Sequence, residues 1–229
     1  MGKDKLKRFR ENLMFAHLFQ PQRDESITGN QEFKGLWHEK FGNANPLILE
    51  LGCGRGEYTV GLSRRFPQNN FIGIDVKGAR LWKGAKTVEE ENITNAAFLR
   101  IRIEFIDNFF AKDEVDEIWI TFPDPQIKKP RKRLTSPLFL ERYGKFLKKG
   151  GIIHLKTDSR LLYDYTLDVI NAHKLPLLES CPDVHKQYQH NELLNIKTFY
   201  ETQFISQGLP ITYIKWQNES VNINDSINS

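Results

Sequence analysis

Short apolar segments of strand length alternate with helical segments along most of this chain, and this order limits the possible folds more than any other feature. Strands are expected at residues 47–51, 71–75, 97–103, 117–122 and 152–156, with late strands at 175–179 and 211–216. Helices are expected at residues 31–41, 80–91, 138–148 and 161–173, and a further helical stretch is expected after the glycines of the first loop, through Arg65. Because short apolar strands alternate with helices, we expect a doubly wound, mostly parallel α/β sheet.

The two ends of the chain depart from this pattern. Residues 1–30 are expected to form a basic arm, because Pro21 and the Gly29-Asn30 pair break regular structure and five bases crowd its start: Lys3, Lys5, Lys7, Arg8 and Arg10. Clustered bases indicate a polyanionic partner more than an even spread would. Residues 31–216 are expected to form one domain, and the polar residues 217–229 a disordered tail.

Several classes of protein are excluded by composition. No apolar stretch approaches the roughly 18 residues that a membrane span needs. The two cysteines, Cys53 and Cys181, form no disulfide framework, and the six histidines show no metal-binding spacing with them. We therefore expect a cytoplasmic protein that binds no membrane and no metal.

A glycine-rich loop joins the first strand to its helix. Residues 50–56 read Glu-Leu-Gly-Cys-Gly-Arg-Gly, and Asp75 ends the next strand, where an acid can bind ribose hydroxyls. The third glycine follows the second by two residues, whereas a dinucleotide fingerprint has three, and no Gly-Lys-Ser/Thr phosphate loop is present. The pattern favours a nucleotide-like cofactor other than NAD or ATP.

An acidic residue before G-x-G-x-G resembles motif I of the class I S-adenosylmethionine-dependent methyltransferases. The resemblance implies a Rossmann-like doubly wound sheet whose last strand is reversed. It also implies that Glu50, Gly52 and Gly54 bind the methionine end of S-adenosylmethionine and that Asp75 binds its ribose. The position of the adenine contact is Arg102, where an acid or amide is common in such proteins.

A rigid carboxylate follows the fourth strand. Residues 121–125 read Thr-Phe-Pro-Asp-Pro, so Asp124 stands between two prolines. Each proline disfavours the helical region for the residue before it, and we expect Phe122 and Asp124 to be extended. Five bases follow within nine residues: Lys128, Lys129, Arg131, Lys132 and Arg133. A fixed carboxylate beside such a basic segment indicates a reaction site for a nucleic acid.

Five stretches together resemble the tRNA (guanine-N7)-methyltransferase family. They are the basic segment 5–12, the segment 121–135, Lys-Thr-Asp at 156–158, Thr-Phe-Tyr-Glu at 198–201, and the C-terminal segment 204–216. The family often has tryptophan after the second proline, where this chain has Gln126, and its basic segment is about two residues longer. The resemblance implies methylation of guanine N7 in the tRNA variable loop, at position 46, with S-adenosylhomocysteine as the other product.

Carried over by position, the resemblance implies that Asp124 is the catalytic residue and also contacts the cofactor. The residues expected to bind substrate are Lys128, Asp158, Thr198, Phe199, Tyr200 and Glu201. The partner is then tRNA, bound by a monomer or a homodimer. Guanine N7 carries an exposed lone pair, so the chemistry needs positioning and no base to generate the nucleophile.

Alternatives remain open at this point. The chain could methylate another substrate, because motif I does not identify the acceptor, or could be a non-catalytic RNA-binding module on the same fold. Asp158 could instead cap the helix that begins near Ser159, and Thr198 could merely cap a turn. Phe199 and Tyr200 could belong to the core.

Overall fold

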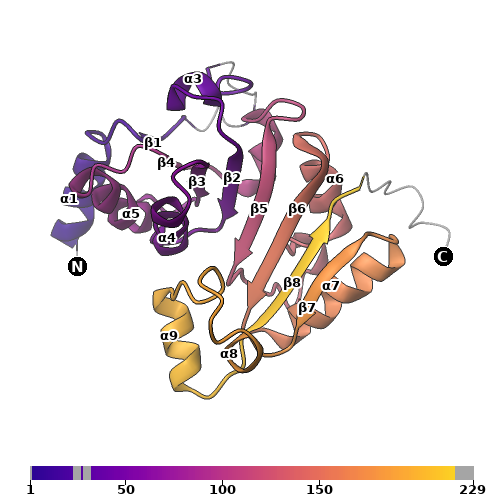
Figure 1. Ribbon diagram of the computed structural model, residues 1–229. Coiled ribbons are helices and arrows are strands. Elements are labelled where there is room, and N and C mark those ends of the chain that lie inside the picture. Colours follow the sequence, from indigo (N-terminus) through magenta and orange to yellow (C-terminus); the bar gives the residue numbers. More distant parts are fainter. Residues whose placement is uncertain (1, 23–26, 28–31, 220–229) are drawn as a thin grey trace. The chain divides into compact units, whose positions relative to one another are not determined.

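The computed structural model describes residues 2–22, 27 and 32–219. The chain divides into two compact units, residues 1–110 and 111–229, and each is described by itself (Figure 1). The predicted Gly29-Asn30 break and most of the predicted tail, residues 220–229, lie outside the described residues.

The first unit contains a parallel sheet in the order β1-β4-β3-β2. Its strands are β1 (Leu18–Phe19), β2 (Leu47–Leu51), β3 (Asn70–Ile74) and β4 (Ala96–Leu99). Among its described residues, the helices are α1 (Gly2–Asn12), α3 (Trp37–Phe41), α4 (Glu57–Arg65), α5 (Gly78–Glu90) and the 3-10 helix η1 (Ile103–Asn108). The three strands β2, β3 and β4 are buried along their whole length, which agrees with their mostly apolar sequences.

The predicted basic arm contains a helix that packs on the first unit. The side-chain amide of Asn12 donates to the carbonyl of Gly78 at 2.8 Å, and the indole of Trp82 donates to Glu11 at 2.5 Å. The Arg8 guanidinium lies 4.8 Å from the centre of the Trp82 ring. These contacts hold α1 against α5, and the chain then adds β1 to the edge of β4, a strand that the sequence pattern did not predict.

The second unit contains a mixed sheet in the order β5-β6-β8-β7. Its strands are β5 (Val115–Thr121), β6 (Leu147–Thr157), β7 (Leu177–Cys181) and β8 (Thr212–Gln217). Strand β8 is antiparallel to both β6 and β7, while β5 and β6 are parallel. The prediction of a mostly parallel sheet with a reversed last strand is therefore confirmed. Its helices are η2 (Pro130–Lys132), α6 (Pro137–Tyr143), α7 (Arg160–Ala172), α8 (Val184–Gln187) and α9 (Phe199–Ser206).

Several predicted elements have different bounds, and β6 begins at Leu147 where the strand was expected from residue 152. The helix expected from residue 31 begins only at Trp37. Gly35 has a left-handed φ of 83°, which a right-handed helix through this position could not contain. The strand expected at residues 97–103 ends at Leu99 and gives way to η1. The helix expected at 138–148 ends at Tyr143, because the apolar residues that follow belong to β6.

The core of the first unit centres on the ring of Phe98, which is fully buried. Glycines at positions 56, 73 and 84 surround this ring, and a Cβ added to any of them would come within 2.8 Å of it. The absence of side chains at these positions lets α4, α5 and β3 approach β4 closely.

We predict that Gly84→Ala destabilises the protein by about 1–3 kcal/mol, since overpacking a filled core costs that much. The new methyl group would lie 2.5 Å from Phe98 Cζ and 2.8 Å from the carbonyl oxygen of Arg55. Urea unfolding measures the change. Gly144→Ala is the matched control, because its added Cβ meets nothing nearer than 3.4 Å, and an equal loss in both variants would contradict the steric explanation.

Candidate functional site

The glycine-rich loop between β2 and α4 has the conformation that its glycines allow. Gly52 and Gly54 have left-handed φ angles of 77° and 57°, which side chains larger than glycine adopt only with strain. The backbone N–H groups of Gly52 and Cys53 both donate to the carbonyl of Ile74, at 2.8 and 3.1 Å. The loop is therefore anchored to the end of β3.

Two buried acids hold this loop in place. Asp75 accepts a hydrogen bond from the N–H of Gly54 at 3.1 Å and another from the N–H of Lys77 at 2.7 Å. Glu50 accepts from the N–H of Thr59 at 2.8 Å and also from the Thr59 hydroxyl. The structure thus brings Glu50, Gly52, Gly54 and Asp75 together at the carboxyl ends of β2 and β3.

Arg102 follows β4, and it lines a pocket of about 510 Å³ together with Val76, Ile101 and Phe105. Its guanidinium is more than half exposed and pairs with the carboxylate of Glu104 at 3.0 Å. Val76 directly follows Asp75, so the pocket adjoins the acid that ends β3. Part of the pocket's apolar lining therefore comes from the segments that follow β3 and β4.

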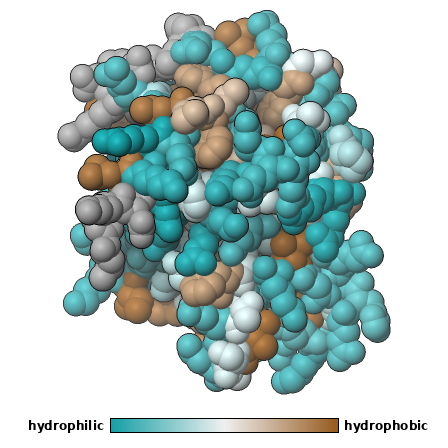
Figure 2. Space-filling view, turned by 90° about the vertical axis from the view of Figure 1, so that its left-hand side faces the viewer, coloured by the Kyte–Doolittle hydropathy of each residue, from teal (hydrophilic) through white to brown (hydrophobic). Residues whose placement is uncertain are grey.

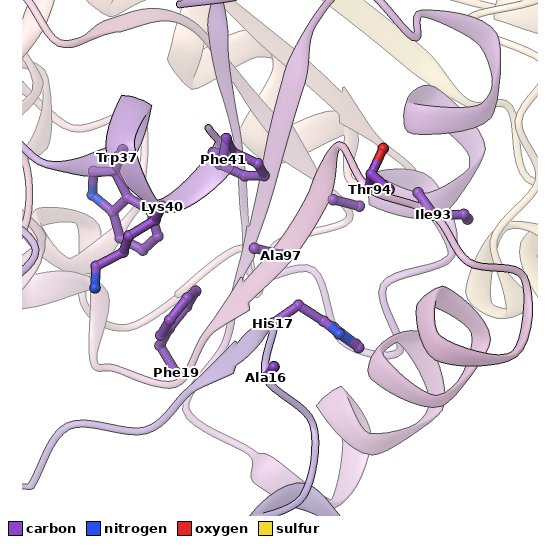
Figure 3. A pocket seen from close by; sticks show the side chains of 10 residues that line it. Ala16, His17, Phe19, Trp37, Lys40, Phe41, Ile93, Thr94 and Ala97 are labelled. Atoms are coloured by element: carbon purple, nitrogen blue, oxygen red, sulfur yellow. The ribbon is translucent and has the colours of Figure 1, made fainter. Parts of the chain in front are cut away.

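A second pocket of the first unit, of about 280 Å³, was not predicted from the sequence. Figure 3 shows Phe19 of β1 and Trp37 and Lys40 of α3 around it, with Ala97 of β4 behind them. Thr94 and Ala96 place it at the amino end of β4, away from Arg102. His17, which also lines it, is hydrogen-bonded through Nε2 to the carbonyl of Ala85 at 2.8 Å.

In the second unit, the Pro-Asp-Pro turn exposes its carboxylate. Asp124 is exposed, and its Oδ1 accepts a hydrogen bond from the N–H of Gln126 at 2.9 Å. The expectation that Phe122 is extended was wrong, because its φ is +47° and that of Gln126 is +46°. The N–H of Phe122 donates to the carbonyl of Lys156 at 2.8 Å, so pairing with the end of β6 holds this strained backbone.

The basic segment after this turn divides into exposed and buried bases. Lys128, Lys129, Arg131 and Lys132 are exposed. Arg133 is only 6% exposed; its Nε donates to the carbonyl of Pro125 at 3.0 Å, and its guanidinium lies 4.2 Å from the centre of the Tyr165 ring. Arg133 therefore supports the turn, while the other four bases are available to an anion.

Asp158 follows β6 and is half-buried. Ser159, not Asp158, caps α7, since the Ser159 side chain accepts from the N–H of Leu162 at 3.3 Å. The interpretation of Asp158 as a helix cap was wrong. Burial raises the pKa of the Asp158 carboxyl above its ordinary value.

The segment 198–201 forms the start of α9. Thr198 caps this helix by accepting from the N–H of Glu201 at 3.1 Å. Phe199 and Tyr200 are 41% and 36% exposed, with ring centres 5.7 Å apart, so they lie outside the core. Glu201 is fully buried and pairs with Lys156 at 2.8 Å, a contact that sequence reasoning missed.

Further bases accompany α1 on the first unit. Lys5, Lys7, Arg8 and Arg10 of α1 are exposed, as are Lys77 and Lys83 at the start of α5 and within it. The face of the molecule in Figure 2, the left-hand side of Figure 1, is mostly hydrophilic with small hydrophobic patches. These bases make the α1–α5 surface suited to a polyanion.

The described part of the chain contains neither a cluster of metal-binding side chains nor a helix that could span a membrane. Within residues 2–22, 27 and 32–219, no group of three or more His, Cys, Asp and Glu side chains could hold a metal ion. Among those same residues, no helix is both long and apolar enough to cross a membrane.

Comparison with known proteins identifies close relatives. Residues 44–214 match a family model described as "Putative methyltransferase". A tRNA (guanine-N(7)-)-methyltransferase from Christiangramia forsetii is 51% identical over 220 residues, which cover 94% of this chain and 98% of the relative. A protein of the same name from Bacteroides thetaiotaomicron is 50% identical, over 95% of this chain and 86% of the relative.

Solved structures show the same fold at low identity. The 16S rRNA methyltransferase KamB superposes with a TM-score of 0.63 and 13% identity, over 82% of this chain and 95% of that chain. A geranyl diphosphate C-methyltransferase from Streptomyces coelicolor, solved with S-adenosyl-L-homocysteine, gives a TM-score of 0.52 and 17% identity, over 88% and 90%. These likenesses confirm the predicted class I methyltransferase type of sheet.

We predict that Asp158→Asn raises the melting temperature at pH 7 by a degree or more. A raised carboxyl pKa means that the folded protein binds the proton more tightly than the unfolded chain, so the ionised form costs stability at neutral pH. The gain should shrink as the pH falls toward about 4, the ordinary pKa of aspartate. Asp168→Asn, at an exposed aspartate of α7, is the control for thermal melts at both pH values, and a gain independent of pH would contradict the prediction.

Proposed function

The chain belongs to the tRNA (guanine-N7)-methyltransferase family, as its motifs predict, and we propose on this premise that it methylates N7 of guanine 46 in the tRNA variable loop. The proposal rests on sequence identity to relatives that bear this name, and this identity extends over nearly the whole chain. Three of the five motif stretches, at residues 121–135, 156–158 and 198–201, lie within residues 44–214, which match the methyltransferase family model.

The loop of the first unit fits S-adenosylmethionine. Open space surrounds the α-carbons of Gly52 and Gly54 where a side chain would stand, so a ligand can approach the backbone closely. We propose that Glu50, Gly52 and Gly54 bind the methionine end and that Asp75 binds the ribose hydroxyls. The pocket beside Val76 and Arg102 then receives the adenine. When bound, the cofactor supplies an electrophilic methyl group on sulfur.

The polar residues of the second unit fit guanine and the RNA backbone. Asp124 and Asp158 are hydrogen-bond acceptors for the N1–H and amino group of guanine, the edge that distinguishes it from adenine. Lys128 is exposed and suited to a phosphate. We propose that the exposed rings of Phe199 and Tyr200 contact bases of the substrate, since RNA-binding proteins stack unpaired bases on aromatic side chains. The lysine and arginine side chains of the α1–α5 surface would add contacts to the RNA backbone.

The reaction needs orientation more than proton transfer. The N7 lone pair forms the new bond to the methyl carbon while the bond from that carbon to sulfur breaks, and no proton leaves the guanine. Holding the two reactants in line can lower the barrier by several kcal/mol. N7 lies in the deep major groove of A-form RNA, so the target base must be exposed or flipped before it reacts. We propose that Asp124 orients the guanine and that it also contacts the cofactor.

Mapping the product tests the function directly. We expect the protein to transfer one methyl group from S-adenosylmethionine to guanine 46 of an unmodified tRNA transcript, located by nuclease digestion and mass spectrometry. The same transcript with adenine at position 46 is the matched control and should remain unmethylated. Methylation of the control transcript would contradict the position, and absence of methyl transfer to either RNA, with cofactor binding intact, would favour a binding module or another acceptor.

We predict that Asp124→Ala lowers kcat for tRNA by about a hundredfold. Hydrogen bonds to a charged acceptor contribute about 1.5–3 kcal/mol each, and 1.36 kcal/mol corresponds to a tenfold change in rate. Asp124→Asn keeps an acceptor for the N–H of Gln126 and separates charge from hydrogen bonding. Steady-state kinetics with Asp168→Ala as the control measures both. Rates near wild type in both Asp124 variants would remove this residue from the mechanism.

A further inference from the structure

Lys156 and Glu201 form an ion pair that is sealed from solvent within the second unit. Both side chains are 0% exposed, and the ammonium nitrogen lies 2.8 Å from the carboxylate. The same nitrogen donates to the carbonyls of Leu194 at 2.6 Å and Ile196 at 3.4 Å. A lysine ammonium has three donors, so all of them have partners on the segment 194–201.

Stability alone is a poor explanation for this pair. Removing two charges from water is expensive, and apolar residues of similar volume in place of a buried pair often leave a protein equally stable or more so. Burial lowers the pKa of Lys156, and the nearby Glu201 carboxylate opposes that change. His185 adds a further polar partner, with Nε2 3.2 Å from Glu201. What the pair supplies is a fixed geometry that apolar contacts would not impose.

The pair connects the three segments of the second unit that carry the proposed substrate residues. Lys156 belongs to β6 and lies two residues before Asp158, which follows this strand. Its carbonyl accepts from the N–H of Phe122, which holds the Pro-Asp-Pro turn, and its ammonium nitrogen lies 5.8 Å from the centre of the Phe122 ring. The Phe122 ring in turn lies 5.8 Å from the ring of Phe204 on α9. Glu201 itself belongs to the first turn of α9.

We propose that Lys156 and Glu201 are positioning residues for methyl transfer, which fix Asp124, Asp158 and the start of α9 in one frame. This inference rests on the proposed function. It also changes the role expected of Glu201, which acts through Lys156 and does not itself contact the tRNA. Phe199 and Tyr200, which precede it, keep their exposed rings because Glu201 is directed inward.

Three variants test this role. Glu201→Gln keeps the shape and an acceptor but removes the charge, and we expect a folded protein whose kcat for tRNA falls at least tenfold. The affinity for S-adenosylmethionine should stay within about threefold in calorimetry, because the glycine loop and Asp75 carry most of the proposed cofactor contacts. Lys156→Met alone leaves a buried carboxylate unpaired and should melt several degrees lower. Lys156→Met with Glu201→Leu should regain the melting temperature without regaining kcat.

The matched control is the ion pair of Lys148 and Asp116, which joins β6 to β5, is partly exposed and lies toward the other end of β6. Lys148→Met with Asp116→Leu should leave kcat near wild type. Recovery of both melting temperature and kcat in the Lys156/Glu201 double variant would reduce the pair to a structural role and overturn the proposal. If the double variant fails to fold, a kcat of Glu201→Gln equal to that of the wild-type protein would likewise overturn the proposal. Absence of tRNA methylation by the wild-type protein would instead overturn the proposed function, and this role with it.

Discussion

An ionised side chain that is removed from water must find partners, and this constraint shapes the loops that carry the site in each unit. In the first unit, the carboxylates of Glu50 and Asp75 take hydrogen bonds from backbone N–H groups of the loop and of the helices that follow. In the second unit, the ammonium of Lys156 donates hydrogen bonds to one carboxylate and two backbone carbonyls. Each charge lies at the carboxyl end of a strand, where backbone groups leave the sheet and need partners of their own.

This arrangement gives the loops definite shapes without long secondary structure. The residues that reach solvent do so because others beneath them are directed inward. Arg133 holds the carbonyl of Pro125 while four neighbouring bases remain exposed. Glu201 is buried while Phe199 and Tyr200 are exposed. A site that must orient a base and a cofactor without removing a proton depends on such support, because its catalytic contribution comes from geometry.

Much of the fold could be predicted because it follows from local pattern. The strand at residues 47–51 has the expected bounds and the helix after it ends at Arg65 as expected, since a mostly apolar run followed by glycines has few other outcomes. The helix α1 and the strand β1 were missed for the opposite reason. Their stability comes from contacts distant in sequence, such as Trp82 with Glu11 and β1 with β4, which no periodicity within residues 1–30 encodes.

The site residues divide in the same way. Sequence could place Glu50, Gly52 and Asp75 together, because the carboxyl ends of parallel strands meet at one edge of a sheet. It could not show the direction in which each side chain of segment 198–201 would face. An extended segment and a helix alternate their faces differently, and Thr198 selects the helix by capping it. Once α9 forms, Glu201 faces inward, and Lys156 near the end of β6 becomes the partner that this buried carboxylate requires.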